Sequence, residues 1–154
     1  MTICYVESPV GRLAIEADHD AVTGLRWAST GECAREEGKS PVLKEAARQL
    51  ERYFARKLKR FDLPLAQRGT DFQKRVWAAM RDIPYGETAT YGGMAMALGS
   101  GPRPVGMACA RNPIPIIVPC HRVLGSGGKE GGFSGGTGLP TKRQLLALEG
   151  VVLL

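Results

Sequence analysis

The sequence predicts an α+β protein in two parts, a small N-terminal antiparallel sheet with one covering helix and a mainly helical C-terminal part. Three observations predict this class. Short apolar segments separated by turn residues fill the first 28 positions, one helical pattern follows at 43–58, and helical patterns broken by tight turns dominate after Thr70. Turn residues at 64–69 place the boundary near residue 67, which gives domains 1–67 and 68–154.

The N-terminal part is expected to form an antiparallel meander. Strands are predicted at 2–7, 12–17 and 22–28, with turn residues at 9–11 and 18–20 between them. A helix that starts at Ser40-Pro41 should cover the sheet. Its apolar residues recur at helical spacing: Leu43, Ala46, Ala47, Leu50, Tyr53, Phe54 and Leu58.

The C-terminal part is expected to open with a helix over residues 71–81. Thr70 followed three residues later by Gln73 is a capping-box pattern, in which each residue satisfies a backbone N–H of the first helical turn. Apolar residues then share one helical face: Phe72, Val76, Trp77 and Met80.

Two more helices are expected around a tight turn. Residues 91–98 read as one helix, residues 99–102 break it, and Pro104 fits the first turn of the next helix, where its missing N–H is not needed. This is the outline of a helix-turn-helix. From the pattern alone an ordinary helical hairpin is the commoner structure.

A cysteine and a histidine stand together after an apolar run. Residues 114–119 predict a strand that delivers Cys120 and His121 at its end, before a glycine-rich loop. A thiolate is the reactive form of cysteine, and a neighbouring base or cation favours it. The alternative is a buried cysteine that only packs, which is the usual role of a free cysteine. The residues alone leave both interpretations open.

Composition permits a polyanionic partner without requiring one. The chain has 154 residues, a net charge of +6 and a pI near 9.4. Positive charge attracts nucleic acids, yet many basic proteins bind none. Neither a secretory leader nor a run of about 20 apolar residues is present, so we expect a cytoplasmic protein without membrane contact. The cysteines lack paired spacing, which suits a reducing compartment: Cys4, Cys33, Cys109 and Cys120.

Residues 112–123, Asn-Pro-Ile-Pro-Ile-Ile-Val-Pro-Cys-His-Arg-Val, closely resemble the active-site signature of the O6-alkylguanine-DNA alkyltransferase family. The resemblance is almost continuous over the last 85 residues and looser before them. Further pieces follow in the family's order: residues 8–11, 50–54, 69–77, 83–88, Tyr91, Arg103, Val105, Gly106, 133–136 and 145–150.

The resemblance implies a fold and an activity. The N-terminal domain would be ribonuclease H-like, and the C-terminal domain would carry a winged helix-turn-helix-like DNA-binding motif. The protein would be a methylated-DNA--[protein]-cysteine S-methyltransferase that takes the alkyl group of O6-alkylguanine, and of O4-alkylthymine, onto its own Cys120 once and irreversibly. Double-stranded DNA bearing the lesion would be its partner, bound through the minor groove with base flipping. A monomer without cofactor is expected.

Catalytic roles carry over to five residues. Cys120 would attack the alkyl carbon, and His121 would draw the thiol proton through a bound water. Glu149 would orient His121 and stabilise its charged form. Tyr91 would donate a proton or hydrogen bond toward the leaving guanine, and Asn112 would organise the active-site turn.

Binding roles carry over to further residues. Arg103 matches the arginine that fills the space left by the flipped nucleotide. The other expected DNA contacts are Thr90, Tyr91, Gly106, Arg122 and Ser126. The flipped base would be held by Pro115, Val123, Phe133 and Ser134. Small residues on the third helix would allow close approach to a narrow groove: Gly106, Ala108 and Ala110.

The chain departs from the family pattern at several points. The interval from Tyr91 to Arg103 is two residues shorter than usual, and about two extra residues fall within 137–140, before a final helix that Thr141 and Gln144 would cap. Phe133 stands where many relatives have tyrosine. Some relatives hold zinc in the N-terminal half, but Cys4, His19 and Cys33 do not match those ligands, so no metal is expected.

Two other functional classes remain as hypotheses. A non-catalytic alkylguanine-binding protein would share the fold, but those relatives replace the reactive cysteine, which is present here as Cys120. A thiol hydrolase with a Cys–His pair would turn over small esters, which a stoichiometric acceptor would not do.

Overall fold

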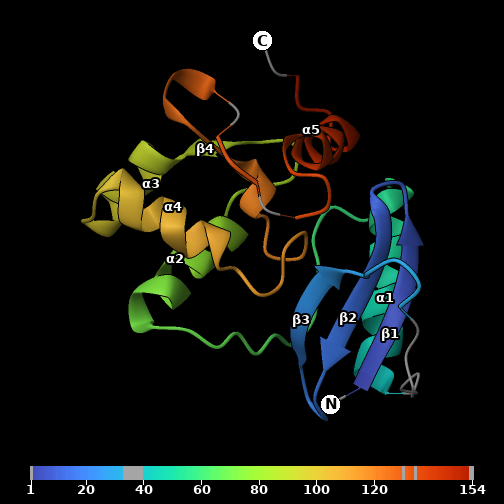
Figure 1. Cartoon of the computed structure of the whole chain (residues 1–154). Helices are drawn as coiled ribbons and strands as arrows, with labels where there is room; N and C mark the ends of the chain where they lie inside the picture. The colour runs from blue at the N-terminus through green and yellow to red at the C-terminus, as the bar shows by residue number, and fades with distance from the viewer. Residues whose placement is uncertain (1, 33–39, 130, 134, 153–154) are drawn as a thin grey trace. The chain divides into compact units, whose positions relative to one another are not determined.

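A computed structural model describes residues 2–32, 40–129, 131–133 and 135–152. The chain divides into two compact units, Met1–Gln67 and Arg68–Leu154. The first unit contains a three-stranded sheet and one long helix, and the second contains the remaining helices with a pair of very short strands. The predicted α+β class is confirmed (Figure 1).

The sheet of the first unit is an antiparallel meander of β1 (Thr2–Ser8), β2 (Gly11–Ala17) and β3 (Val22–Trp27). β1 and β2 pair without a break from Thr2 opposite Ala17 to Ser8 opposite Gly11. Gly11 adopts a φ of 116°, which a side chain would strain, and this lets the chain reverse within two residues. The predicted meander is confirmed.

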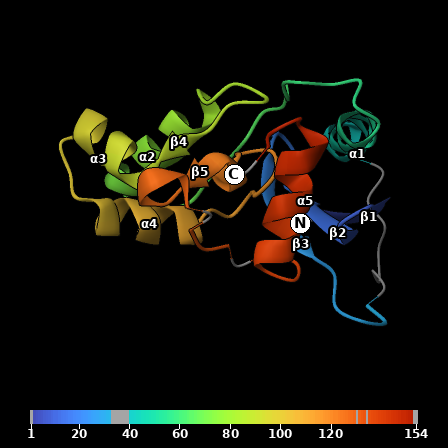
Figure 2. The ribbon, with the colours of Figure 1, turned by 90° about the horizontal axis from the view of Figure 1, so that it is seen from above.

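Helix α1 (Pro41–Phe54) covers this sheet and contacts all three strands. Figure 2 looks nearly along α1 and shows the strands on one side of it. Leu43, Leu50 and Tyr53 are fully buried, as a helical stripe facing a sheet requires. The predicted extension to Leu58 is wrong: the helix ends at Phe54, and Arg56 takes a left-handed φ of 61° that turns the chain away.

In the second unit, α2 (Asp71–Arg81) begins at the predicted capping box. The Thr70 hydroxyl accepts a hydrogen bond from the Gln73 backbone N–H at 3.1 Å, and the Gln73 side chain accepts one from the Thr70 N–H at 2.9 Å. Trp77 is buried on α2, and its indole N–H donates to the Ala108 carbonyl at 2.8 Å. This bond fixes α2 to the helix that carries Ala108.

The predicted helix pair is present as α3 (Tyr91–Leu98) and α4 (Pro102–Ala110). Gly99 ends α3 in the left-handed conformation, with a φ of 66°, and α4 begins three residues later. Helices α2, α3 and α4 contact one another and lie side by side in both views (Figures 1 and 2). The short interval between Tyr91 and Arg103 is accommodated by this tight turn.

Residues 114–119 do not form the predicted strand. They fold into a compact buried turn in which the Val118 N–H donates to the Ile114 carbonyl and Ile116 takes a left-handed φ of 73°. Cys120–Arg122 then form one turn of 3₁₀ helix, η1. The predicted strand is therefore wrong: the apolar run is largely buried, but it turns back on itself because its backbone forms hydrogen bonds within the segment.

The chain continues into β5 (Val123–Leu124), which pairs in parallel with β4 (Ala89–Thr90) just before α3. A short turn, η2 (Ser126–Gly128), and a glycine-rich loop lead to α5 (Leu139–Leu148). The predicted capping box of α5 is wrong: Gly138 is the N-cap, and Thr141 lies inside the helix, where its hydroxyl accepts from the Thr137 N–H. Within the described residues, every helix is too short or too polar to cross a bilayer.

Candidate active site

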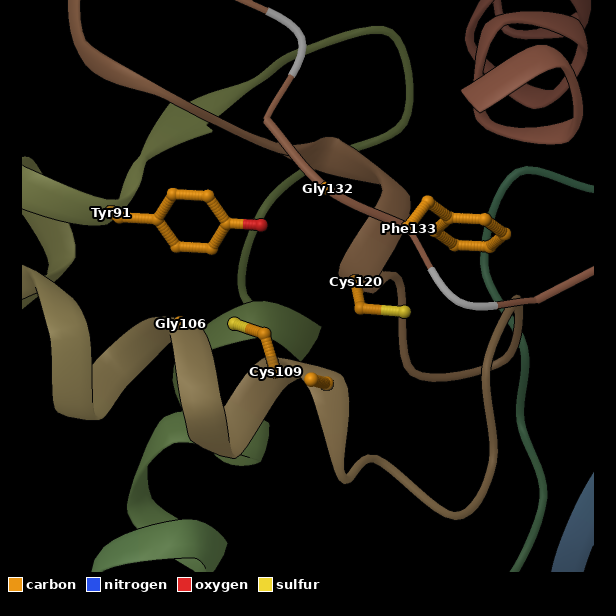
Figure 3. Close-up of a pocket in the computed structure, with 7 residues that line it drawn as sticks. Tyr91, Gly106, Cys109, Cys120, Gly132 and Phe133 are labelled. Atoms are coloured by element: carbon orange, nitrogen blue, oxygen red, sulfur yellow. The ribbon is translucent and has the colours of Figure 1, made fainter. Parts of the chain in front are cut away.

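Cys120 opens into a pocket of about 420 Å³ in the second unit. The cysteine begins the η1 turn and is partly exposed, whereas His121 and Arg122 beside it are buried. Figure 3 shows the ring of Tyr91 on one side of Cys120 and that of Phe133 on the other. The lining comes from α3, α4, η1 and the glycine-rich loop: Tyr91, Gly106, Cys109, Ala110, Cys120, Gly132 and Phe133.

Asn112 shapes the turn that carries the thiol. Its side-chain N–H donates to the Val118 carbonyl at 2.8 Å, and its oxygen accepts from the Ile114 N–H at 3.0 Å. Burial raises the pKa of the Cys120 thiol above its ordinary value, while a hydrogen bond from the Asn112 side chain opposes that rise. Cys120 is therefore a neutral thiol at rest and needs a base to become a nucleophile.

A buried carboxylate holds the histidine beside Cys120. One Glu149 oxygen lies 2.7 Å from His121 Nε2, and both Glu149 oxygens accept hydrogen bonds from Arg122, at 2.8 and 3.0 Å. Arg122 also donates to the Ile83 carbonyl at 2.7 Å. The negative charge of Glu149 is thus shared between a permanent cation and an imidazole.

This arrangement fixes the proton of His121. Because a carboxylate accepts at Nε2, that nitrogen carries the hydrogen and Nδ1 keeps its lone pair. Nδ1 is buried and has no hydrogen-bond partner among the described residues. Burial lowers the pKa of His121 below its ordinary value, and the bond to Glu149 only partly offsets this. A neutral imidazole with a free lone pair has the protonation state that a general base requires.

Tyr91 brings an acid to the opposite wall. Thr90 caps α3 by accepting from the Gly93 N–H at 2.9 Å, and this places Tyr91 as the first residue of the helix. Burial raises the pKa of Tyr91 to about 12, so its hydroxyl stays protonated. In Figure 3 the hydroxyl points into the pocket. Gly131, with a φ of 69°, passes so close to this ring that a Cβ would lie 3.0 Å from it.

Comparison with known proteins finds relatives over the whole chain. Residues 71–151 match the family model described as 6-O-methylguanine DNA methyltransferase, DNA binding domain, and residues 1–67 match the one described as its ribonuclease-like domain. A methylated-DNA--protein-cysteine methyltransferase of Methanosarcina acetivorans is 48% identical over 97% of this chain and 99% of its own length. The chain belongs to the 6-O-methylguanine DNA methyltransferase family.

Further relatives agree in sequence and in structure. The methylated-DNA--protein-cysteine methyltransferase of Mycobacterium tuberculosis is 45% identical over 94% of this chain and 89% of its own. A crystal structure of Mycobacterium tuberculosis OGT in complex with DNA superposes with a TM-score of 0.85 and 43% identity, over 97% of this chain and 92% of that chain. Membership of the methyltransferase family is therefore supported across both units.

Within this methyltransferase fold, Arg122 requires a correction. We expected it to contact DNA, but its guanidinium is buried and held by Glu149 and the Ile83 carbonyl, over the ring of Tyr85 at 5.8 Å. A side chain with these partners cannot reach a phosphate without breaking a buried ion pair. Arg122 positions Glu149 instead.

The other expected DNA contacts lie at the surface or at the pocket. Arg103 is exposed in the first turn of α4, Ser126 is exposed on η2, and Gly106 lines the pocket with open space where a Cβ would stand. Ala108 is a second correction: it was expected on the open face of α4, but it is buried against α2.

The residues expected to hold the base are only partly brought together. Phe133 lines the pocket, whereas Pro115 is half-buried in the turn beneath and is not part of the lining. Val123 is buried, and its carbonyl accepts a hydrogen bond at 2.6 Å. Ser134 lies outside the described residues.

The donor to Val123 is Lys142, which sequence reasoning missed. Its side chain is fully buried on α5, and its ammonium donates to the Val123 carbonyl at 2.6 Å and the Gly132 carbonyl at 3.2 Å. It also lies 6.0 Å from the centre of the Tyr91 ring. The missed signal is its spacing: Lys142 falls in a helical stripe with Leu145, Leu146 and Glu149, all of them buried.

Lys142 ties the loop over the pocket to β5 and places a positive charge near the thiol. Replacing Lys142 with methionine should raise the pKa of Cys120, because the ammonium favours the thiolate. It should also lower the alkylation rate about tenfold, since two carbonyls lose their donor and the loop is released. Iodoacetamide labelling of Cys120 against pH measures the first effect. Lys129→Met, at an exposed lysine of the same loop, is the matched control, and an equal effect there would contradict the prediction.

Cys109 is the second thiol of the pocket. Its sulfur lies 3.4 Å from that of Met80, and burial, together with the proximity of Cys120, raises its pKa to about 12. Burial disfavours the thiolate of both cysteines, but only Cys120 is followed by a histidine, which makes Cys120 the better candidate for the nucleophile. Within the described ranges, no group of three His, Cys, Asp or Glu side chains is arranged to hold a metal ion.

Proposed function

We propose that this protein repairs DNA by transferring the alkyl group of O6-alkylguanine, and of O4-alkylthymine, to its own Cys120. The observation that carries the proposal is a thiol at the mouth of a pocket, next to a neutral histidine whose proton is fixed by Glu149, in a chain of this family. The protein acts as a monomer in the cytoplasm, where thiols stay reduced.

Recognition comes first. Helices α3 and α4 form the helix-turn-helix that meets duplex DNA at its minor groove, with exposed Arg103 at the start of α4. The alkylated guanine leaves the stack and enters the pocket, at a cost of a few kcal/mol that a weakly paired lesion reduces. Arg103 occupies the space that the base leaves, and Phe133 packs against the flipped ring.

Transfer then proceeds in one displacement. His121 Nδ1 takes the thiol proton through a water, and the Cys120 sulfur attacks the alkyl carbon in line. The S–C bond forms as the C–O6 bond breaks, and the electron pair of that bond goes to guanine. Tyr91 gives its proton to the ring as this charge develops, so guanine leaves in its neutral form. The proton that His121 took from the thiol then passes through solvent to the Tyr91 oxygen, and both side chains return to their neutral forms.

The product sets the stoichiometry. An alkyl thioether offers no leaving group that water can displace under mild conditions, unlike the acyl-enzyme of a cysteine hydrolase. Each molecule therefore reacts once, and no cofactor takes part.

Intact-mass measurement after incubation with duplex DNA containing O6-methylguanine tests the proposal, beside Cys120→Ser. We expect one methyl-sized increment on the wild type, mapped to Cys120, and none on the variant. Lesion-selective binding without an increment would instead identify a non-catalytic lesion binder. Repeated turnover of small esters would identify a thiol hydrolase.

A further inference from the structure

Helix α4 presents a narrow exposed face that includes one large apolar side chain. Val105, Ala108 and Cys109 are buried, whereas Arg103, Met107 and Ala110 are exposed. The exposed residues are four and three positions apart, so they share one side of the helix. Met107 stands in the middle of this side and is 56% exposed.

Exposure of one methionine is ordinary, because apolar atoms make up much of any protein surface. The surroundings of Met107 are more specific. Exposed Arg103 lies one turn before it and exposed Arg111 one turn after it, at positions i–4 and i+4. Gly106 and Ala110, on either side of it along the helix, both line the pocket of Cys120. Met107 therefore lies at the rim of the pocket between two cations.

We propose that Met107 is an apolar contact to DNA that packs into the minor groove beside the flipped nucleotide. This inference rests on the proposed function. Exposed Arg111 supplies attraction to phosphates, Arg103 enters the space that the base leaves, and the methionine between them is of the kind that wedges against base steps. Methionine is unbranched and flexible, so it adapts to a groove wall of any sequence.

Spacing along the helix limits where Met107 acts. Four residues of α helix rise about 6 Å, and successive bases of one strand are about 3.4 Å apart. Met107 therefore meets DNA within about two base steps of Arg103, close enough to help hold open the site from which the base leaves. Because the contact is apolar, it adds affinity without adding to the salt dependence of binding.

Met107→Ala tests the inference, with Met96→Ala as the matched control. Met96 is 86% exposed on α3, so both variants remove the same exposed side chain from the same helix pair. Met107→Ala should weaken binding to the O6-methylguanine duplex about five- to tenfold, with an unchanged salt slope. Met96→Ala and Met107→Leu should stay within about twofold of wild type.

Free O6-methylguanine base separates this effect from the pocket itself, since the base needs the pocket but no groove contact. Methyl transfer from the free base should be equal in wild type and Met107→Ala. Unchanged duplex affinity in Met107→Ala, or an equal loss with the free base, would overturn the inference. A wild type that never gains a methyl group would refute the proposed function alone, because the duplex affinities of Met107→Ala and Met96→Ala still decide the groove contact.

Discussion

Replacing Glu149 with glutamine should slow the alkylation of Cys120 by about 10²- to 10⁴-fold, because the histidine beside it would hold its proton on the wrong nitrogen. Arg122 donates to both carboxylate oxygens, so the amide nitrogen of glutamine faces a donor whichever way it turns. In the orientation that faces His121, the amide donates to Nε2 and moves the proton to Nδ1. His121 then has no lone pair for the thiol proton.

Stability should fall in the same variant. The Arg122 guanidinium is buried and loses its counter-charge, and breaking a buried ion pair by removing one partner costs about 3–5 kcal/mol. Single-turnover mass spectrometry with lesion duplex measures the rate, and urea unfolding measures the stability. Glu87→Gln makes the same change at an exposed position of the same unit and should alter neither. A folded Glu149→Gln protein that reacts within threefold of wild type would exclude His121 as the base.

The pH profile of the wild type adds an independent check on this base. Burial lowers the pKa of His121, so the neutral imidazole persists at and below pH 6.5, and the rate should be level above that value and fall only in more acidic solution. If a freely ionised thiolate reacted instead, the rate would climb about tenfold per pH unit toward the pKa of Cys120, which lies above 9.0. The two profiles differ most between pH 7 and 9.

Tyr91→Phe should lower the rate by about 10²-fold and leave folding intact. The ring remains to pack against Gly131, but the departing guanine loses the only hydroxyl among the described residues that line the pocket. Since the pKa of Tyr91 is raised to about 12, the wild-type hydroxyl donates across the whole working range, and the loss should be the same at pH 7 and pH 9.

The control for Tyr91→Phe is Tyr85→Phe, and the single-turnover alkylation rates of the two variants are compared. Tyr85 donates to the Leu148 carbonyl at 3.2 Å and lies outside the pocket, so its loss should change the rate less than threefold. A Tyr91→Phe rate equal to that of Tyr85→Phe would show that guanine leaves without help from the hydroxyl.

Local signals predicted most of the elements. The strands of the meander, the helix that starts at Pro41 and the capping box at Thr70 depend on neighbours within four residues, so they were visible in sequence. The pairing of Glu149 with His121 was accessible only through the family resemblance, since 28 positions separate them. No pattern of neighbouring residues in the sequence indicates that Glu149 and His121 are buried together.

The main differences concern one apolar segment and the burial of side chains. Residues 114–119 have the composition of a strand, but they find no partner strand and bond to one another instead. Arg122 and Lys142 carry charges that are ordinarily exposed to solvent. They can be buried because Glu149 and backbone carbonyls from other elements accept their hydrogen bonds. Ala108 faces inward because it shares the buried side of α4 with Val105 and Cys109.

The sequence by itself therefore indicated the candidate nucleophile and base and where most helices and strands begin, since the Cys120–His121 pair and the helix caps are short-range features of the chain. Only the tertiary structure decided which charged side chains are buried, which face of α4 is open and which nitrogen of His121 is free. Those properties depend on the burial and hydrogen bonding of groups far apart in sequence, and the free energy of such contacts exists only after the chain has folded.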